Sequence, residues 1–501
     1  MAARGRADPA RPARGRAAPA RPARRRADPA RRVAFDVLRA VAERDAYANL
    51  LLPALLAERG LTGRDAALAT ELTYGALRGQ GSYDAILAIC SDRDLGRLDP
   101  PLRPVLRLGA HQLLATRIGA HAAVATSVDL AKDVAGPRPA GFVNAVLRRV
   151  ATRDLESWLE IAAPSRADDL AGHLSVAYSH PRWIVRALSE ALGEDAGPVL
   201  AGPVLAETEA ALAADGERPR VTLCALPGLA DPAELVAGGA QPARWSPFGA
   251  YLAEGDPAQV AAVAEGRASV QDEASQLAAL ALARADAAGG EPGPAGGRWL
   301  DLCAGPGGKA RLLAGLAEGQ GARLLAADVR PHRARLLRAQ LPPAGAGGAA
   351  SAAVVAADAT APAWPPGTFD RVLADVPCSG LGALRRRPDA RWRRSPDDVA
   401  ALGPLQRALL AAALDSAVPG GVVAYVTCSP HLAETRDVVT DVLAGRDDAE
   451  VLDAPAVLPE VPGLRCPPPY GAFAQFWPHR HGTDAIFLAL LRVGVPGRPV
   501  K

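Results

Sequence analysis

The stretch Trp299-Leu-Asp-Leu-Cys-Ala-Gly-Pro-Gly-Gly-Lys309 constrains the fold more than any other part of the chain. It combines a short apolar strand, an acidic residue, a glycine-rich turn and the start of a helix. A turn that contains Gly305, Gly307 and Gly308 lets the backbone approach a ligand closely, because no Cβ stands in the way. Such turns follow the first strand of doubly wound sheets, where nucleotide-like ligands bind.

The turn matches neither of the two common phosphate-binding motifs. It lacks the G-x-G-x-x-G spacing of dinucleotide-binding folds. Against the P-loop pattern, Cys303 takes the place of the first glycine and Ala310 that of the Mg²⁺-binding hydroxyl residue. Taken alone, the turn could be structural or ligand-binding, so the rest of the chain must decide.

From residue 298 onward, strand patterns alternate with helical patterns, which predicts an α/β domain with a parallel sheet. The expected strands cover 298–303, 322–328, 352–358, 369–375, 422–428 and 485–492. Asp328 ends the second strand, twenty residues after Gly308, where a carboxylate can accept hydrogen bonds from ribose hydroxyls. It could instead cap the helix that starts near Pro331. Asp358 ends the third strand and could face an adenine ring. Without a pyrophosphate-binding motif, S-adenosylmethionine fits these positions better than NAD.

Two cysteines follow neighbouring strands of the predicted sheet. Asp375-Val-Pro-Cys378 ends the fourth strand, and Cys428 ends the next one in Thr427-Cys-Ser429. A single cysteine is usually a small buried hydrophobic residue. Two at adjacent strand tips, each followed by serine, indicate a functional site instead.

Residues 31–155 are predicted to be helical. Val33, Val37, Leu38 and Val41 are spaced for one helical face, as are the leucines at 50, 51, 55 and 56. The segments Arg32–Leu38, Glu71–Arg78 and Phe142–Arg149 resemble the NusB type of RNA-binding helical domain. That resemblance implies a structured RNA partner and makes Arg148 and Arg149 candidate RNA contacts.

The motifs of the α/β domain resemble those of the RNA cytosine-C5 methyltransferases. With the NusB-like domain, the chain from about 31 to 495 is similar to the 16S rRNA methyltransferases of the RsmB/Sun type, whose expected target is C5 of cytosine 967. The resemblance implies that Cys428 attacks C6 of the cytosine. It also implies that Cys378 assists release of the methylated base, and that Asp375 binds the cytosine edge. The residues expected to bind S-adenosylmethionine are Cys303, Ala304, Gly305, Pro306, Gly307, Gly308, Lys309, Asp328, Asp358 and Asp375.

A basic loop follows the first cysteine motif. Six of its side chains suit phosphate contacts combined with stacking on a base, and the loop is similar to the R-x-P-D-x-[RK]-W loop of the family. The candidate RNA-binding residues there are Arg385, Arg386, Arg387, Arg391, Trp392 and Arg393. Two departures from the family pattern are Ala310, where Thr or Ser is usual, and Leu432-Ala-Glu-Thr435, which leaves only Glu434 of the usual E-N-E. The sequence does not decide whether Lys309 pairs with Asp375 or with the cofactor.

The expected domains are a disordered Arg/Pro/Ala-rich tail (1–30), the helical domain (31–155), an α+β RNA-binding or linker domain (156–290) and the methyltransferase domain (291–495). The tail repeats a ten-residue unit that cannot build a core. It could bind RNA phosphates without sequence preference. It could instead be a solvated tail without a function, or result from a misplaced start codon.

The cysteines, histidines and apolar segments of the chain limit the class of protein to which it can belong. The six cysteines contain no C-x-x-C pair, which argues against a zinc ribbon or a disulfide framework. His479 and His481 lack the further ligands of a metal site. No apolar run is long enough to cross a membrane. We expect a cytoplasmic, monomeric enzyme without metal.

Two other functions fit the residues less well. One is methylation of tRNA or another RNA by the same chemistry. The other is a non-catalytic NusB-like RNA-binding or antitermination factor with a decayed cofactor site. The intact Asp375, Cys378 and Cys428 argue against decay.

Overall fold

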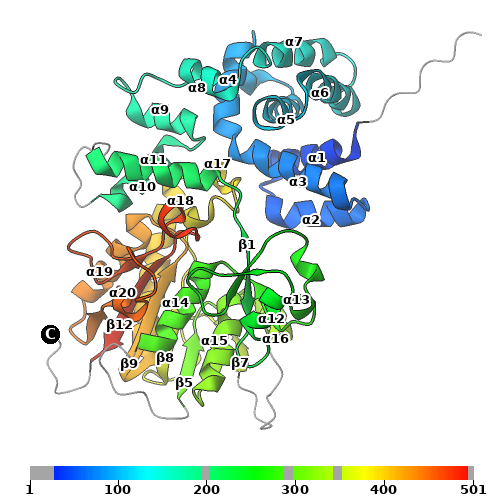
Figure 1. Cartoon of the computed structure of the whole chain (residues 1–501). Coiled ribbons are helices and arrows are strands. Elements are labelled where there is room, and N and C mark those ends of the chain that lie inside the picture. The colour runs from blue at the N-terminus through cyan, green and yellow to red at the C-terminus, as the bar shows by residue number, and fades with distance from the viewer. Residues whose placement is uncertain (1–26, 194–201, 286–296, 342–351, 495–501) are drawn as a thin grey trace, which may run out of the picture.

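The computed structural model describes residues 27–193, 202–285, 297–341 and 352–494. It has a helical domain at one end, a layer of three helices beneath it, and a large sheet flanked by helices at the other end (Figure 1). Residues 1–26 of the predicted tail and the expected domain boundary at 290 lie outside the described ranges. Within those ranges, no helix is both long and apolar enough to span a bilayer.

The helical domain begins two residues before the predicted boundary. The Asp28 side chain accepts a hydrogen bond from the backbone N–H of Arg31 and so caps the first helix. The helices are α1 (Pro29–Arg44), α2 (Ala48–Glu58), α3 (Gly63–Arg78), α4 (Gln80–Cys90), α5 (Leu102–Ala115), α6 (Ala120–Ala135), α7 (Ala140–Val150) and α8 (Leu155–Ala162).

Of the two apolar helical faces predicted from the sequence, the one on α1 is buried and the one on α2 is only partly buried. Val33, Val37 and Leu38 of α1 are buried in the core of this domain. The face predicted on α2 is partly wrong, because Leu50 is 68% exposed while Leu52 is buried. Helix α2 is apolar on more than one side, so its spacing alone could not identify the buried face.

The segment between the helical domain and the large sheet divides into separate packing units. Helices α9 (Leu170–Ala177), α10 (Arg182–Leu192) and α11 (Gly202–Gly216) share a core with Leu381 and Trp477 from the C-terminal part of the chain. This helical layer therefore belongs structurally to the junction between the two ends of the molecule.

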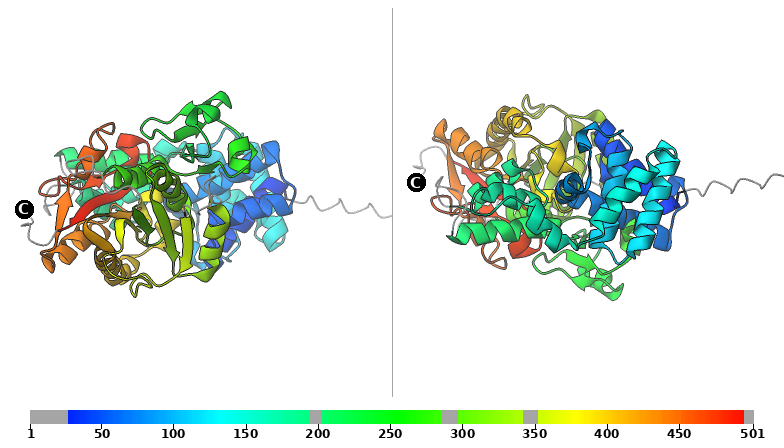
Figure 2. Two further views of the ribbon diagram at one scale, coloured as in Figure 1. Left: turned by 90° about the horizontal axis from the view of Figure 1, so that it is seen from below. Right: turned by 90° about the horizontal axis from the view of Figure 1, so that it is seen from above.

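A small antiparallel sheet follows, with strand order β2-β3-β1-β4. Its elements are β1 (Val221–Ala225), α12 (Pro232–Ala237), β2 (Gln241–Pro242), β3 (Gly249–Leu252), α13 (Ala261–Ala264) and β4 (Ala268–Val270). Figure 2 shows this unit projecting from one side of the molecule. Helix α14 (Glu273–Arg284) already packs in the core of the large sheet, so that core begins before the expected boundary at 290.

The large sheet has strand order β10-β12-β9-β8-β5-β6-β7, and β11 pairs with β12. Its strands are β5 (Arg298–Asp301), β6 (Arg323–Asp328), β7 (Ala352–Ala356), β8 (Phe369–Asp375), β9 (Ala417–Thr427), β10 (Ala449–Leu452), β11 (Ala474–Gln475) and β12 (Phe487–Val493). Its helices are α15 (Gly308–Gly319), α16 (Pro331–Gln340), α17 (Ala390–Arg393), α18 (Pro396–Ser416), α19 (Arg436–Ala444), α20 (Ala454–Val457) and α21 (Pro478–His481). The predicted α/β fold is confirmed.

Both faces of this sheet are covered. In β9, Ala424 and Val426 pack in the core that contains α14 and α15, whereas Val423 and Tyr425 pack in the core that contains α18 and α19. Burial on both faces explains why these strands read as continuous apolar runs instead of alternating ones.

The prediction of a parallel sheet is confirmed for β5 to β9 and wrong for the expected strand 485–492. Strands β5 to β9 pair in parallel, but β12 is antiparallel to β9, and β10 is antiparallel to β12. The chain turns between β11 and β12 through the short helix α21, and β12 pairs antiparallel with β11 as well as with β9 and β10.

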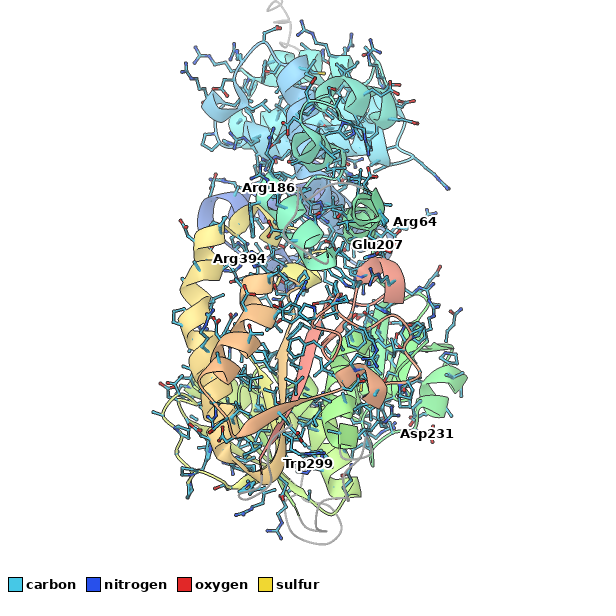
Figure 3. All side chains as sticks on the ribbon, turned by 90° about the vertical axis from the view of Figure 1, so that its left-hand side faces the viewer. Arg64, Arg186, Glu207, Asp231, Trp299 and Arg394 are labelled. Carbon is cyan, nitrogen blue, oxygen red and sulfur yellow. The ribbon has the colours of Figure 1, made fainter. Side chains whose placement is uncertain are left out.

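The carboxyl ends of the parallel strands point toward the helical domain. Trp299, near the start of β5, lies at the end of the molecule farthest from that domain, and Arg394 lies near the junction (Figure 3). The predicted ligand turn and both cysteine motifs therefore lie on the side of the sheet that faces the helices.

Arg391, a candidate RNA contact, instead fastens the junction. Its side chain is fully buried, and its guanidinium donates to the carbonyl oxygens of Arg78, Ser179 and Asp215 at 3.1, 3.3 and 2.5 Å. Burial lowers the pKa of Arg391 to about 10, so the group stays charged at neutral pH. The RNA-binding assignment of Arg391 is wrong, because no nucleic acid can reach this side chain in the fold.

Replacing Arg391 with Met should destabilise the protein by about 2–4 kcal/mol. The variant keeps the side-chain length but leaves three buried carbonyls without their charged donor. The measurement is a urea unfolding curve followed by circular dichroism. Arg103→Met is the control, since the Arg103 guanidinium donates to only one carbonyl, that of Leu95. Equal midpoints for the two variants would contradict the structural role of Arg391.

Candidate active site

The glycine turn is shaped by close contacts that only glycine allows. It joins β5 to α15, which begins at Gly308. A Cβ on Gly305 would lie 2.2 Å from a carboxylate oxygen of Asp328, and Gly307 has a φ of +118°. Glycine is therefore required here by the close approach of β6 and α16, and cofactor binding by residues 303–309 stays a prediction.

Asp328 has hydrogen-bond partners in the protein that fit the second of the two roles considered for it, support of the helix that follows β6. It is buried at the end of β6, and its side chain accepts from the backbone N–H groups of Gly305, at 3.2 Å, and Arg330, at 2.8 Å. The second contact supports the start of α16. A carboxylate offers further acceptor positions, so ribose binding stays a prediction.

Asp358 is exposed just beyond β7. Its side chain accepts from the backbone N–H of Thr360 at 2.9 Å and from the Thr360 hydroxyl at 2.7 Å. These two bonds lower its pKa, so it is ionised at neutral pH. The adenine contact proposed for Asp358 stays a prediction.

Lys309 pairs with Asp375, which answers the question that the sequence left open. The Lys309 Nζ atom lies 2.8 Å from a carboxylate oxygen of Asp375. Burial alone would lower the pKa of Lys309, but the charge and hydrogen bond of Asp375 raise it. The lysine is therefore a fixed positive charge beneath the two cysteine motifs.

Asp301 is a site residue that the sequence reasoning did not select. It ends β5, is buried, and both carboxylate oxygens lack a hydrogen-bond partner among the described residues. Burial, and then the nearby charge of Asp375, raise the pKa of Asp301 to about 8. The signal in the sequence was an acid at the tip of the first strand, directly before the glycine turn.

The two cysteines are brought into contact by the pairing of β8 with β9. Asp375 aligns with Val426 in the parallel register, so the chain segments after both strands leave the sheet side by side. The sulfur atoms of Cys378 and Cys428 lie 3.3 Å apart as free thiols. The juxtaposition expected from their strand-end positions is therefore present.

The surroundings of the two sulfurs differ in charge. A hydrogen bond from Cys378 lowers the pKa of Cys428, and Lys309 and Arg387 lower it further, against the effects of burial and Asp375. The contact with Cys428 and burial raise the pKa of Cys378. Of the two sulfurs, Cys428 is therefore the one that loses its proton more readily, and Cys378 is the one that keeps it.

A buried polar group holds the segment after Cys378. The Glu434 carboxylate accepts from the Ser379 N–H at 2.7 Å and from its hydroxyl at 2.5 Å, and Gln406 adds a third donor at 3.3 Å. Glu434 is the one acidic residue that this chain keeps from the E-N-E motif usual in the family. Its spacing in the sequence did not reveal that it fixes the backbone beside Cys378.

Most of the basic loop faces inward. Arg385 and Arg386 form buried or half-buried ion pairs with Asp272 and Asp484. The Arg393 guanidinium donates to the carbonyl of Ala46 at 2.6 Å and pairs with the Asp389 carboxylate at 2.9 Å.

Arg385, Arg386 and Arg393 are therefore not free to bind RNA as the sequence predicted, and the same holds for Arg391. Their charges are matched by buried carboxylates and carbonyls. Apart from Asp389, which is four residues before Arg393, these partners lie far away along the chain and cannot be identified from local sequence.

Arg387 and Trp392 are the members of this loop that stay exposed. Arg387 is close enough to Cys428 for its charge to affect that thiol. In the helical domain, Arg148 and Arg149 are also exposed, and Arg149 donates to Asp92 at 2.8 Å. RNA binding by these four residues stays a prediction.

The part of the chain that the structure describes contains no group of three or more His, Cys, Asp or Glu side chains arranged to hold a metal ion. His479, considered as a ligand from the sequence, lies 2.6 Å from a carboxylate oxygen of Glu207. His481 accepts from the backbone N–H of Trp477 at 2.9 Å. Both histidines thus have structural partners.

Known proteins share this combination of domains. Residues 293–492 match the family of 16S rRNA methyltransferase RsmB/F, and residues 28–152 match the NusB family. Putative methyltransferase Rv1407 of Mycobacterium tuberculosis is 51% identical over 467 residues, which are 92% of this chain and 96% of that protein. Ribosomal RNA small subunit methyltransferase B of Pseudomonas putida is 34% identical over 477 residues, covering 92% and 98%. The crystal structure of PH0851 has a TM-score of 0.70 at 22% identity, covering 92% of this chain and 98% of that one, and supports the fold.

The fold and the site together define a methyltransferase with an N-terminal RNA-binding domain of the NusB type. More narrowly, the chain belongs to the RsmB/F family of 16S rRNA methyltransferases.

Removing the Cys378 thiol should raise the pKa of Cys428. In Cys378→Ala the hydrogen bond that favours the Cys428 thiolate is lost, so alkylation of Cys428 by iodoacetamide should require a higher pH than in the wild type. Mass spectrometry of the Cys428 peptide across a pH series gives the midpoint. Cys466→Ala is the control, because Cys466 is buried away from the pair. An unchanged midpoint in Cys378→Ala would show that the 3.3 Å contact does not tune Cys428.

Proposed function

We propose that the protein transfers a methyl group from S-adenosylmethionine to C5 of a cytosine in RNA, most specifically cytosine 967 of 16S rRNA. The observation that carries the proposal is the pair Cys378 and Cys428 at 3.3 Å, beside the Lys309–Asp375 ion pair and at the carboxyl edge of the sheet. A methyltransferase that acts on oxygen or on an amino group has no need for a thiolate and a thiol at this position.

The glycine turn and the strand-end acids fit S-adenosylmethionine. Gly305 and Gly307 allow the turn to pack closely against its neighbours, and Asp328 holds a buried carboxylate next to Gly305, which we assign to the ribose. Asp358 would face the adenine. The cofactor supplies a methyl group that is electrophilic because its sulfur carries a positive charge.

The cysteine pair makes the cytosine nucleophilic. C5 of cytosine does not attack a sulfonium methyl group unaided. The Cys428 thiolate adds to C6, forming an S–C6 bond and moving the electrons of the C5=C6 double bond toward C5. C5 then takes the methyl group, and the bond between that methyl and the sulfonium sulfur breaks. Lys309 stabilises the thiolate before the addition.

Release reverses the addition. A base removes the C5 proton, the C5=C6 double bond forms again, and the S–C6 bond breaks to return Cys428 as a thiolate. Cys378 keeps its proton because its pKa is raised, which suits the role of assisting this step. Asp375, held by Lys309, is positioned to accept from the cytosine amino edge and to stabilise the charge that develops there.

The RNA partner is proposed from the family and from the exposed basic residues. Relatives of similar length are named ribosomal RNA small subunit methyltransferase B. Arg387 beside the cysteines and Arg148 on the helical domain are free to contact phosphates. Such contacts should make RNA affinity fall as salt rises. Methylation of tRNA or another RNA is the alternative within the same chemistry.

Bisulfite sequencing tests the reaction and the substrate together. Purified protein incubated with S-adenosylmethionine and unmodified 16S rRNA should protect one cytosine from conversion, and tRNA under the same conditions should stay unprotected. Asp375→Ala is the inactive control. Protection of tRNA alone would reassign the substrate. Absence of protection on every RNA would support a non-catalytic RNA-binding protein instead.

The two cysteine variants should give opposite results on a denaturing gel. Cys428→Ala should abolish methyl transfer and form no covalent complex with RNA. Cys378→Ala should transfer the methyl group but release product slowly, so that a denaturation-resistant protein–RNA complex accumulates. A complex that forms with Cys428→Ala and not with Cys378→Ala would exchange the two roles and leave the reaction unchanged.

A further inference from the structure

Four consecutive residues, Arg391 to Arg394, connect the helical domain to the segment that carries Cys378. They comprise the end of α17 and the residue that follows it. In Figure 3, Arg394 lies between the helical domain and the large sheet. The methyl transfer proposed above does not by itself require a contact between the helical domain and the Cys378 segment.

The first three of these residues contact the helical domain. Arg391 donates to the carbonyl of Arg78 at the end of α3. The ring of Trp392 lies against Gly81 of α4, because a Cβ on Gly81 would come within 2.4 Å of Trp392 Cζ2. The Arg393 guanidinium lies 4.4 Å from the ring centre of Tyr47, between α1 and α2. The helical domain therefore fixes where α17 lies.

The fourth residue turns toward the active site. The Arg394 Nε atom donates to the carbonyl oxygen of Ser379 at 3.1 Å. On the other side, Glu434 holds the N–H and the hydroxyl of the same serine. Both backbone polar groups of the residue after Cys378 are thus held, the N–H by Glu434 and the carbonyl by Arg394, directly after α17.

We propose that Arg394 is a positioning residue for the cysteine pair, and that α17 transmits the placement of the helical domain to Cys378. The inference rests on the proposed function for its link to catalysis. The position of Ser379 sets the direction of the adjacent Cys378 thiol, which in turn decides whether that thiol reaches Cys428. A change in the helical domain that displaces α17 therefore alters the reactivity of Cys428 without touching it.

A single methyl group in the helical domain provides the test. Gly81→Ala adds a Cβ that collides with Trp392, while alanine favours the helix in which it lies. Gly141→Ala is the matched control, since a Cβ at that helical position meets nothing within 4 Å. We expect Gly81→Ala to move the midpoint of Cys428 alkylation to higher pH, and Gly141→Ala to leave it at the wild-type value. Equal midpoints in all three proteins would overturn the proposal.

Arg394 itself is tested by a pair of substitutions. Arg394→Ala removes the donor to Ser379, whereas Arg394→Lys keeps a donor and should restore part of the effect. Arg394→Ala should lower kcat by on the order of tenfold to a hundredfold, at unchanged KM for RNA. The acid limb of its kcat/KM profile should move to higher pH. A rise in KM alone, with no change in the pH profile, would make Arg394 an RNA contact and overturn the proposal.

The two readouts separate this inference from the proposed function. Alkylation of Cys428 requires neither RNA nor cofactor. A wild-type protein that methylates no RNA would remove the proposed reaction, while the Gly81→Ala shift would still show that α17 couples the domains. Circular dichroism and thermal midpoints equal to those of Gly141→Ala would show that the shift does not come from partial unfolding.

Discussion

The parallel pairing of β8 with β9 is the constraint on which the rest of the site depends. Hydrogen bonds between these strands fix Asp375 opposite Val426, and this register brings the two following cysteines within 3.3 Å. A shift by one residue would turn one side chain to the opposite face of the sheet. Cores on both sides of β9 resist such a shift, so apolar burial throughout the domain secures the geometry of two sulfur atoms.

The charges around the site are arranged by the same architecture. Lys309 lies in the first turn of α15, directly after the turn that follows β5, and meets Asp375 at the end of the adjacent β8. The resulting positive charge beside Cys428 favours a thiolate there, and the contact between the sulfurs leaves the proton on Cys378. Two chemically identical side chains thereby acquire different properties from their surroundings.

The helical domain also takes part in the architecture of the catalytic domain. Arg391 has no access to solvent, and its three carbonyl partners come from the helical domain and the helical layer beneath it. Burying a guanidinium is costly unless its donors are matched. A junction of this kind tolerates few alternative arrangements, which suits an enzyme that must hold RNA and a reacting base in one orientation.

The sequence by itself determined the α/β and helical domains, the glycine turn, the strand-end acids and the cysteine pair. All but the cysteine pair depend on spacing within a short segment, and local backbone geometry follows such spacing. The two cysteines are 50 residues apart, and their proximity was predicted from their places at the ends of neighbouring strands. Only the tertiary structure decided the partner of Lys309, the antiparallel β12, the burial of Asp301 and the inward direction of four arginines. A buried arginine and a phosphate-binding arginine look alike in a sequence. Their difference lies in carboxylates and carbonyls such as those of Asp484 and Asp215, which the folded chain brings from far away in the sequence.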